Sequence, residues 1–270
     1  MNKKVYKQIL PLRTDEKVKD QFDWLPISVY KPGKGKEWKE IIQDTGDVKT
    51  RRSSNCKYLP NLRFSEFNPE LAEKIVRYWS LEGHLIVDPF AGRATRGLVS
   101  LTLNRRYEGY EVAPTTYKET KTKVKEYGGY LFNLDGCKME LTEDKSANLV
   151  FTCPPYHRQE RYESADSQLS DIKDYDKFLD RIEECIKNIY RVLDDNGFVC
   201  WVCGDWRDGK QYKTFHIDSI NKFRDNGFKL WDIVIIENIS PFAPLQAGKV
   251  AAKRYTSRVH EYLLVFRKDI

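Results

Sequence analysis

Short apolar runs and amphipathic stripes alternate along the chain after residue 67. Runs typical of strands cover residues 84–88, 106–111, 130–135, 147–152, 197–205, 229–239 and 261–268. Helical periodicity covers a segment that begins after Asn68, and residues 95–104, 114–126, 174–193 and 214–225, with Asn196-Gly197 as the stop of the fourth helix. This alternation predicts an α/β fold with a mostly parallel, seven-stranded sheet and helices on both faces.

The two ends of the chain depart from this alternation. No helical pattern separates the last two strands, so the last strand is predicted to be reversed. Residues 1–60 show no sustained period, which predicts an irregular, basic N-terminal extension with one or two short helices, packed through Trp24 and Trp38. Residues 61–270 then form the main domain.

Composition narrows the class of protein. A hydrophobic content of 40% is too high for a disordered chain. The N-terminus lacks the apolar region of a signal peptide and no apolar run reaches membrane-spanning length, so we expect a soluble, cytoplasmic protein with no membrane partner. The six cysteines and four histidines show no zinc-ligand spacing, and no metal is predicted. Cys200 and Cys203 fall on opposite faces of a strand, which favours core packing over a redox pair.

Charge is unevenly distributed. Residues 1–60 hold 14 Lys or Arg against 8 Asp or Glu, which accounts for the whole net charge of +6. A basic arm suits a polyanion such as nucleic acid, although a solvated surface explains it equally well. Residues 241–260 contain Lys249, Lys253, Arg254 and Arg258 and no acid, and we favour a phosphate-contacting loop there. Residues 157–173, with Arg158, predict a mobile lid or a base-recognition loop.

Four predicted strand ends carry unusual chemistry. They are the stretch from Asp88 to Gly97, then Glu111, Asp135, and the stretch from Thr152 to Tyr156. In an open α/β sheet such ends share one edge, so we expect them to converge on one crevice. Each acid taken alone is equally consistent with an ordinary surface position.

The first of these stretches reads DPFAGRATRG. Gly92 lets a ligand approach the backbone, and Thr95 lies near a helix N-terminus. Ala94 stands where a dinucleotide motif has a second glycine. Glu111 can accept hydrogen bonds from both ribose hydroxyls of a nucleoside, and Asp135 can accept from the amine of an adenine.

The last stretch, FTCPPY, joins a strand end to two prolines. Consecutive prolines cannot donate to a sheet ladder and they stiffen the chain. Pro154 and Pro155 therefore form a rigid support for the ring of Tyr156.

The two stretches resemble motifs of the DNA methyltransferases that methylate amino groups. Those enzymes carry Asp-Pro-Phe followed by Gly-x-Gly-Thr, and Asp, Asn or Ser before Pro-Pro-Tyr. The resemblance runs from about residue 60 to the C-terminus. The cofactor motif comes first, an order similar to members with recognition elements placed late or at the ends. The stretch DQFDWLPISVYKPGKGKEWKE is also similar to extensions on phage-borne members.

This resemblance implies a Rossmann-like methyltransferase fold and S-adenosylmethionine as cofactor. It places Asp88, Phe90 and Gly92 around the methionine part, Glu111 on the ribose and Asp135 near the adenine. Further residues implied at the cofactor are Thr95, Thr152 and Phe67. Phe67 and Asn68 have an equally good structural explanation as a hydrophobic staple and a helix cap.

The resemblance also implies roles for the proline stretch. Tyr156 stacks on a base flipped out of DNA, and the carbonyl of Pro154 accepts from its exocyclic amine, adenine N6 or cytosine N4. Cys153 departs from the family pattern, because a thiol is a weak acceptor. It is either a tolerated replacement or a nucleophile toward a ring carbon.

Three alternatives stay open. The substrate is RNA or a protein glutamine amide instead of DNA, or the chain is a nucleic-acid-binding protein on a degenerate methyltransferase scaffold. Ala94 and Cys153 motivate the last alternative. The sequence does not determine the oligomeric state.

Overall fold

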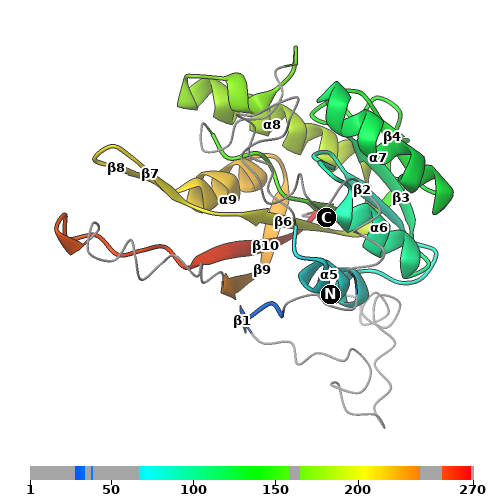
Figure 1. The fold of residues 1–270 in the computed structure, drawn as a ribbon, viewed down its shortest axis with the longest axis horizontal. Coiled ribbons are helices and arrows are strands. Elements are labelled where there is room, and N and C mark those ends of the chain that lie inside the picture. Colours follow the sequence, from blue (N-terminus) through cyan, green and yellow to red (C-terminus); the bar gives the residue numbers. More distant parts are fainter. Residues whose placement is uncertain (1–27, 34–37, 39–66, 158–164, 238–250, 269–270) are drawn as a thin grey trace, which may run out of the picture.

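The computed structural model describes residues 28–33, 38, 67–157, 165–237 and 251–268 (Figure 1). Its main sheet contains eight strands in the order β1-β9-β10-β6-β5-β2-β3-β4. The strands are β1 Val29–Tyr30, β2 Leu85–Asp88, β3 Arg106–Tyr110, β4 Tyr130–Phe132, β5 Ala147–Thr152, β6 Leu193–Cys203, β9 Phe228–Glu237 and β10 His260–Lys268. The helices are α5 Pro69–Trp79, α6 Thr95–Thr102, α7 Pro114–Glu126, α8 Tyr175–Val192 and α9 Phe215–Asp225, with a 3-10 turn η2 at Leu169–Asp171.

Strand direction agrees with the prediction from sequence. Strands β2 to β6 pair with one another in parallel, and β10 runs antiparallel to both β6 and β9, between which it lies. All seven predicted strands form, and the last is reversed. The mostly parallel, Rossmann-like sheet is therefore confirmed.

Two strand pairings were not predicted. Strand β1, from the region expected to be irregular, pairs in parallel with β9, with Val29 opposite Ile235. The outer edge of β9 offers unpaired backbone groups, and a short extended segment satisfies some of them. A separate hairpin, β7 Trp206–Asp208 and β8 Gln211–Lys213, follows β6. Its loop is Gly209-Lys210, with Gly209 at a φ of +57°, and a glycine at the first loop position is a hairpin signal that was present in the sequence.

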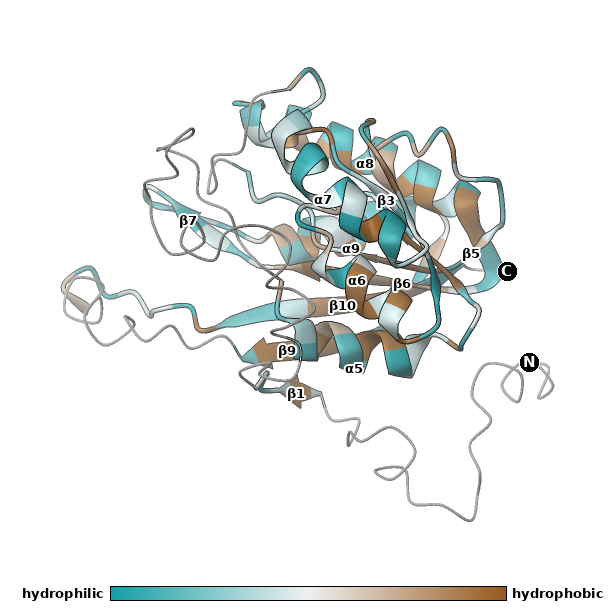
Figure 2. Cartoon of the chain, turned by 45° about the vertical axis from the view of Figure 1, so that its right-hand side comes forward, coloured by the Kyte–Doolittle hydropathy of each residue, from teal (hydrophilic) through white to brown (hydrophobic). Residues whose placement is uncertain are grey.

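Helices cover both faces of the sheet, as predicted. One apolar cluster joins α5, α6 and α7 to one face, and a second joins α8 and α9 to the other. Cys200 belongs to the first cluster and Cys203 to the second, which confirms that they point to opposite faces. Figure 2 shows apolar residues along the strands, and polar and apolar residues alternating around α5 and α8.

The start of α5 and the end of α8 can be compared with the boundaries predicted from cap and turn residues. Helix α5 begins as predicted, with the Asn68 side chain accepting a hydrogen bond from Leu71 N at 3.0 Å and Pro69 at the first position. Helix α8 covers Tyr175–Val192, within one residue of the predicted span at each end. Leu193 already pairs with Ala147 of β5, so β6 begins at Leu193, before the predicted strand start at Gly197.

The described part of the N-terminal region packs against α5. Trp38 is buried and donates from Nε1 to Glu73 Oε2 at 2.8 Å, and Tyr30 is buried and donates to Glu70 Oε1 at 3.3 Å. Packing through Trp38 is confirmed, whereas Trp24 lies outside the described residues. Within the described ranges, we find no helix with the length and apolarity to cross a membrane.

Candidate active site

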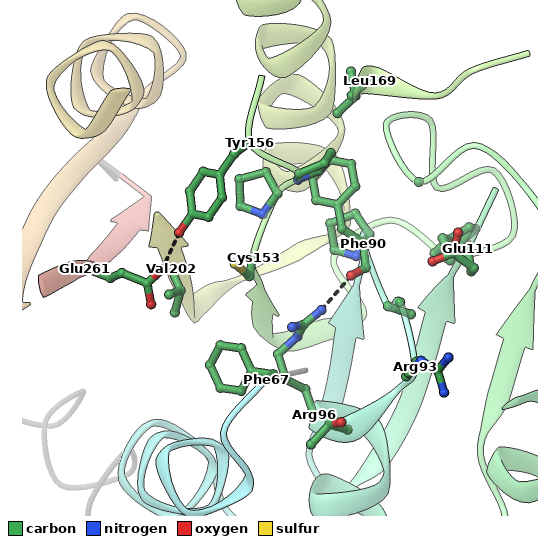
Figure 3. Close-up of a pocket in the computed structure, with 18 of the residues that line it drawn as sticks. Phe67, Phe90, Arg93, Arg96, Glu111, Cys153, Tyr156, Leu169, Val202 and Glu261 are labelled. Carbon is green, nitrogen blue, oxygen red and sulfur yellow. Dashed lines mark hydrogen bonds between the residues drawn. The ribbon is translucent and has the colours of Figure 1, made fainter. Parts of the chain in front are cut away.

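A cavity of about 490 Å³ opens at the carboxyl ends of β2, β3 and β5 (Figure 3). Its volume is typical of small-molecule sites. Ten of the site residues predicted from sequence line it: Phe67, Phe90, Gly92, Thr95, Glu111, Asp135, Cys153, Pro154, Pro155 and Tyr156. The predicted strand ends therefore do converge on one crevice.

Asp88 and Thr152 lie below the cavity and join its two halves. Strands β2 and β5 pair in parallel, with Val87 opposite Val150, so their carboxyl ends lie side by side. Thr152 Oγ1 donates to Asp88 Oδ1 at 2.7 Å, and both side chains are fully buried. This bond joins the glycine-containing turn to the proline stretch.

The Asp88 carboxylate is occupied by groups of the protein itself. Arg96 Nε donates to Oδ2 at 2.8 Å, Tyr107 OH donates to Oδ2 at 3.3 Å, and Phe90 N donates to Oδ1 at 3.2 Å. Asp88 is not one of the described residues that line the cavity. The carboxylate thus holds the turn in place from beneath, rather than facing the cavity.

Arg96 was not singled out from the sequence, although it lies inside the motif. Its Nη2 also donates to the carbonyl of Phe90 at 2.6 Å, and its guanidinium lies 5.0 Å from the centre of the Phe67 ring. Burial lowers the pKa of Arg96, but Asp88, together with Cys153 and Tyr107, outweighs burial and the net shift is upward. Arg96 therefore stays charged and braces the turn from the first turn of α6.

The turn itself shows why the motif usually contains glycines. Gly92 has a φ of +55°, and Ala94, the N-cap of α6, also has a φ of +55°. Ala94 thus adopts the left-handed conformation that glycine enters without cost. Its methyl group is completely buried in the core cluster, which offsets part of the strain. The departure from the family motif leaves the turn intact.

Glu111 directly follows β3 and lies at the cavity wall. Its Oε1 accepts from Ala113 N at 2.7 Å. Burial raises the pKa of Glu111 to about 7, although hydrogen bonds from the backbone of Ala113 and Gly92 oppose the shift. Because the pKa of Glu111 is close to neutral pH, a ligand that donates hydrogen bonds to the carboxylate would stabilise its charged form.

Asp135 lies at the cavity too, but not at a strand end. Strand β4 stops at Phe132, and a turn carries the chain on to Asp135. Asp135 Oδ2 forms an ion pair with Arg181 Nη2 of α8 at 2.7 Å, and Oδ1 accepts from Cys137 N at 3.0 Å. The prediction that β4 reaches Asp135 was wrong, because β4 ends at Phe132, opposite Tyr110, the last residue of its partner strand β3.

The proline stretch leaves β5 at Thr152 and turns toward β10. Pro154 is buried, and Tyr156 is half-buried with its hydroxyl donating to Glu261 Oε1 at 2.7 Å (Figure 3). Burial, together with Cys153 and Glu261, raises the pKa of Tyr156 well above its usual value. The hydroxyl therefore remains protonated and keeps this bond.

Glu261 lies in VHEYLLVFRK, a stretch that shares the resemblance to the family, but sequence reasoning gave this residue no role. It stands one residue inside the last strand, whose reversed direction brings the start of that strand to the cavity edge. Only the pairing of β10 between β6 and β9 reveals this position. A signal was present in principle, since an acid at the start of an otherwise apolar strand is unusual.

The predicted nucleic-acid contacts divide into two groups. Arg158 and Lys249 lie outside the described residues. Lys253, Arg254 and Arg258 are exposed, and the Arg258 guanidinium lies 5.9 Å from the centre of the Tyr156 ring. The predicted basic segment thus reaches the rim of the cavity through Arg258.

The fold matches those of two solved structures with different described activities. The cyclase SpnF aligns with a TM-score of 0.53 and 13% identity, over 75% of this chain and 82% of that one. A protein from Methanosarcina mazei, described as one of the SAM-dependent methyltransferases, aligns with a TM-score of 0.50 and 11% identity, over 72% of this chain and 96% of that one. The architecture is therefore the Rossmann-like fold of SAM-dependent methyltransferases. A cyclase shares it, so the fold alone does not decide the reaction.

Sequence comparison defines the family. The profile described as DNA methylase, for N6 and N4 methyltransferases, matches residues 2–122 and 147–270. The chain belongs to this family of DNA methylases.

Curated relatives share only part of their length with the chain. The type II methyltransferase M.MthZI of Methanothermobacter thermautotrophicus is 28% identical over 149 residues, 48% of this chain and 42% of the relative. The orphan methyltransferase M.BamHII of Bacillus amyloliquefaciens is 28% identical over 129 residues, 46% of this chain and 40% of the relative. The chain thus aligns with less than half the length of these relatives.

Proposed function

We propose that the protein transfers a methyl group from S-adenosylmethionine to an exocyclic amine in DNA, adenine N6 or cytosine N4. The observation that carries this proposal is the joining of the two motifs at one cavity, through the 2.7 Å bond between Thr152 and Asp88. Membership of the DNA methylase family supports it. Cofactor, substrate and target atom are parts of the proposal.

The turn and its neighbours fit a nucleoside cofactor. Glu111 offers a carboxylate at the cavity whose pKa of about 7 falls when ribose hydroxyls donate to it. Gly92 leaves the backbone open, since an added Cβ there would meet nothing within 4 Å. S-adenosylmethionine would supply an electrophilic methyl group on a sulfonium. Phe67, with Arg96 beneath it, would close the other end of this half of the cavity.

The proline stretch fits a base that has left its stack. Pro154 and Pro155 fix the backbone, and the bond from Tyr156 to Glu261 fixes the ring. A fixed aromatic ring gives a stacking face, and stacking contributes roughly 1–3 kcal/mol per base. Arg258 and the neighbouring Lys253 and Arg254 would contact phosphates at the rim.

The test is a labelling experiment with nucleoside identification. Purified protein receives methyl-labelled S-adenosylmethionine with unmodified DNA or with RNA, and the product is digested and its nucleosides are separated. We expect label in N6-methyladenine or N4-methylcytosine from DNA. A Tyr156→Ala variant should lose about 10- to 100-fold in rate, since it loses the stacking energy.

Other labelled products would contradict the proposal. Label confined to RNA would refute DNA as the substrate. Label in 5-methylcytosine would refute amine transfer and make Cys153 a nucleophile.

A further inference from the structure

Glu261 presents a second, unused carboxylate oxygen to the cavity. Its Oε1 accepts from Tyr156 OH, and within the described part of the chain Oε2 takes part in no hydrogen bond or ion pair. Figure 3 shows Glu261 beside Val202, on the same side of the cavity as Tyr156 and Cys153. Cys153, Tyr156 and Glu261 all line the cavity, and the first and last of them both raise the pKa of Tyr156.

The chemistry proposed for the cavity requires such an acceptor. An exocyclic amine has two hydrogens, and holding both fixes the orientation of its lone pair. The carbonyl of Pro154 can accept one of them. Cys153, next in the chain, offers only a thiol, which is a weak acceptor. A second strong acceptor must therefore come from elsewhere in the chain.

The topology of the sheet supplies Glu261 at this place. Strand β10 is antiparallel to β6, with Tyr262 opposite Cys203, so the first residues of β10 lie at the carboxyl edge of the parallel strands. Glu261 thus comes to the same edge as Cys153, although 108 positions separate the two in the sequence. Among the described residues that line the cavity, the other acids are differently placed. Asp135 pairs with Arg181, Glu237 pairs with Lys31, and Glu111 accepts from Ala113 N.

We propose that Glu261 is a catalytic residue that accepts a hydrogen bond from the target amine through Oε2, and so supplies the acceptor that Cys153 lacks. This inference rests on the proposed function. When the nitrogen lone pair forms its bond to the methyl carbon, the carbon–sulfur bond breaks and its electron pair stays on sulfur. The nitrogen then carries a positive charge and releases one proton, which Glu261 takes and passes to solvent.

Three variants separate this role from the support of Tyr156. Glu261→Ala removes both roles, Tyr156→Phe removes only the hydroxyl bond, and the double variant tests whether their costs add. Cys153→Asp in the Glu261→Ala background restores a carboxylate at the other position. Glu140→Ala, an exposed acid in a weak 3.9 Å ion pair with Lys138, is the matched control.

Two readouts are measured after the wild-type target position has been mapped on unmodified DNA. The first is the single-turnover rate of methyl transfer. The second is the affinity, without cofactor, for a duplex with the target base compared with a duplex whose target base lacks the exocyclic amine. The second readout does not depend on activity.

We expect Glu261→Ala to lower the rate about 100-fold and Tyr156→Phe about fivefold, since Glu261→Ala removes the contact with the amine as well as the bond to Tyr156, whereas Tyr156→Phe removes only that bond. The wild type should prefer the amine-bearing duplex about tenfold, and Glu261→Ala should lose this preference. In the Glu261→Ala background, Cys153→Asp should raise the rate at least about tenfold.

Opposite results would overturn the inference. If Tyr156→Phe costs as much as Glu261→Ala and the double variant costs no more, then Glu261 only positions Tyr156. If Glu261→Ala keeps the preference for the amine, the proposed contact is absent. An active wild type with an equally active Glu261→Ala refutes this inference alone, whereas an inactive wild type refutes the proposed function with it.

Discussion

The two halves of the cavity obtain their polar groups in different ways. On the turn side, the stretch from Asp88 to Gly97 contains both the carboxylate of Asp88 and the guanidinium of Arg96 that pairs with it. Arg96 also holds the backbone carbonyl of Phe90 in the same stretch. On the proline side, the stretch from Thr152 to Tyr156 supplies a stiff backbone and a ring, and its polar partner Glu261 comes from the last strand.

The two sides of the same sheet edge are therefore built differently, one from a single stretch of sequence and the other from distant segments. On the turn side, the charged partner of the motif's acid lies in the same stretch, and the acid is used for structural support. The proline side is assembled from distant segments, so it can vary at one position, such as Cys153, when another segment compensates. The following predictions test this contrast.

The largest effect should come from breaking the buried pair on the turn side. Asp88→Ala leaves the Arg96 charge without its partner in a site where both side chains are almost completely buried. Such a loss costs about 3–5 kcal/mol of unfolding free energy. Urea denaturation of the variant and the wild type measures it.

The control for this variant is an exposed pair. Lys187→Ala breaks the ion pair with Glu183, in which the Lys187 side chain is 61% exposed, and should cost less than about 0.5 kcal/mol. Equal costs for the two variants would show that Asp88 and Arg96 are not a structural support.

The next effect is a pH dependence on the turn side. The pKa of Glu111 is raised to about 7, so the carboxyl is protonated below that pH and loses acceptor strength toward ribose hydroxyls. Affinity for S-adenosylmethionine should fall as the pH falls below 7, by at most about tenfold per unit for one proton. Titration calorimetry between pH 5.5 and about 8 measures it.

Glu111→Gln provides two comparisons for this prediction. The variant should bind the cofactor with no dependence on pH in this range. Because the folded pKa lies above the unfolded one, the stability contributed by Glu111 is present below the unfolded pKa and is lost as pH rises to about 7. As the pH rises from acid to neutral, the free energy of unfolding of the variant should therefore increase relative to that of the wild type by up to about 3 kcal/mol. A constant difference would contradict the raised pKa.

The smallest effect should come from the exposed basic segment on the proline side. Lys253→Ala should lower DNA affinity only a few-fold, and should reduce the slope of log affinity against log salt by about 1. Fluorescence anisotropy with a labelled duplex at several salt concentrations measures this slope. Lys125→Ala, exposed on α7, should leave the slope unchanged. Equal slopes for the wild type, Lys253→Ala and Lys125→Ala would show that Lys253 does not contact DNA.

Local signals predicted the elements well and their ends less well. The cap at Asn68 and the strand that ends at Thr152 were predicted because a few adjacent residues decide them. The start of β6 and the end of β4 were misplaced, because pairing with neighbouring strands decided these boundaries. Strand β1 could not be predicted, since only the open edge of β9 makes its two residues extended.

The sequence by itself determined the alternation of strands and helices, the reversed last strand, and the two motifs that meet at one sheet edge. These features follow from periodicity and from glycine and proline, whose effects act over a few residues. Only the tertiary structure decided that Asp88 faces Arg96 instead of the cavity, and that Glu261 reaches Tyr156. Both depend on which side chains are brought together by strand order, a property that no local pattern contains.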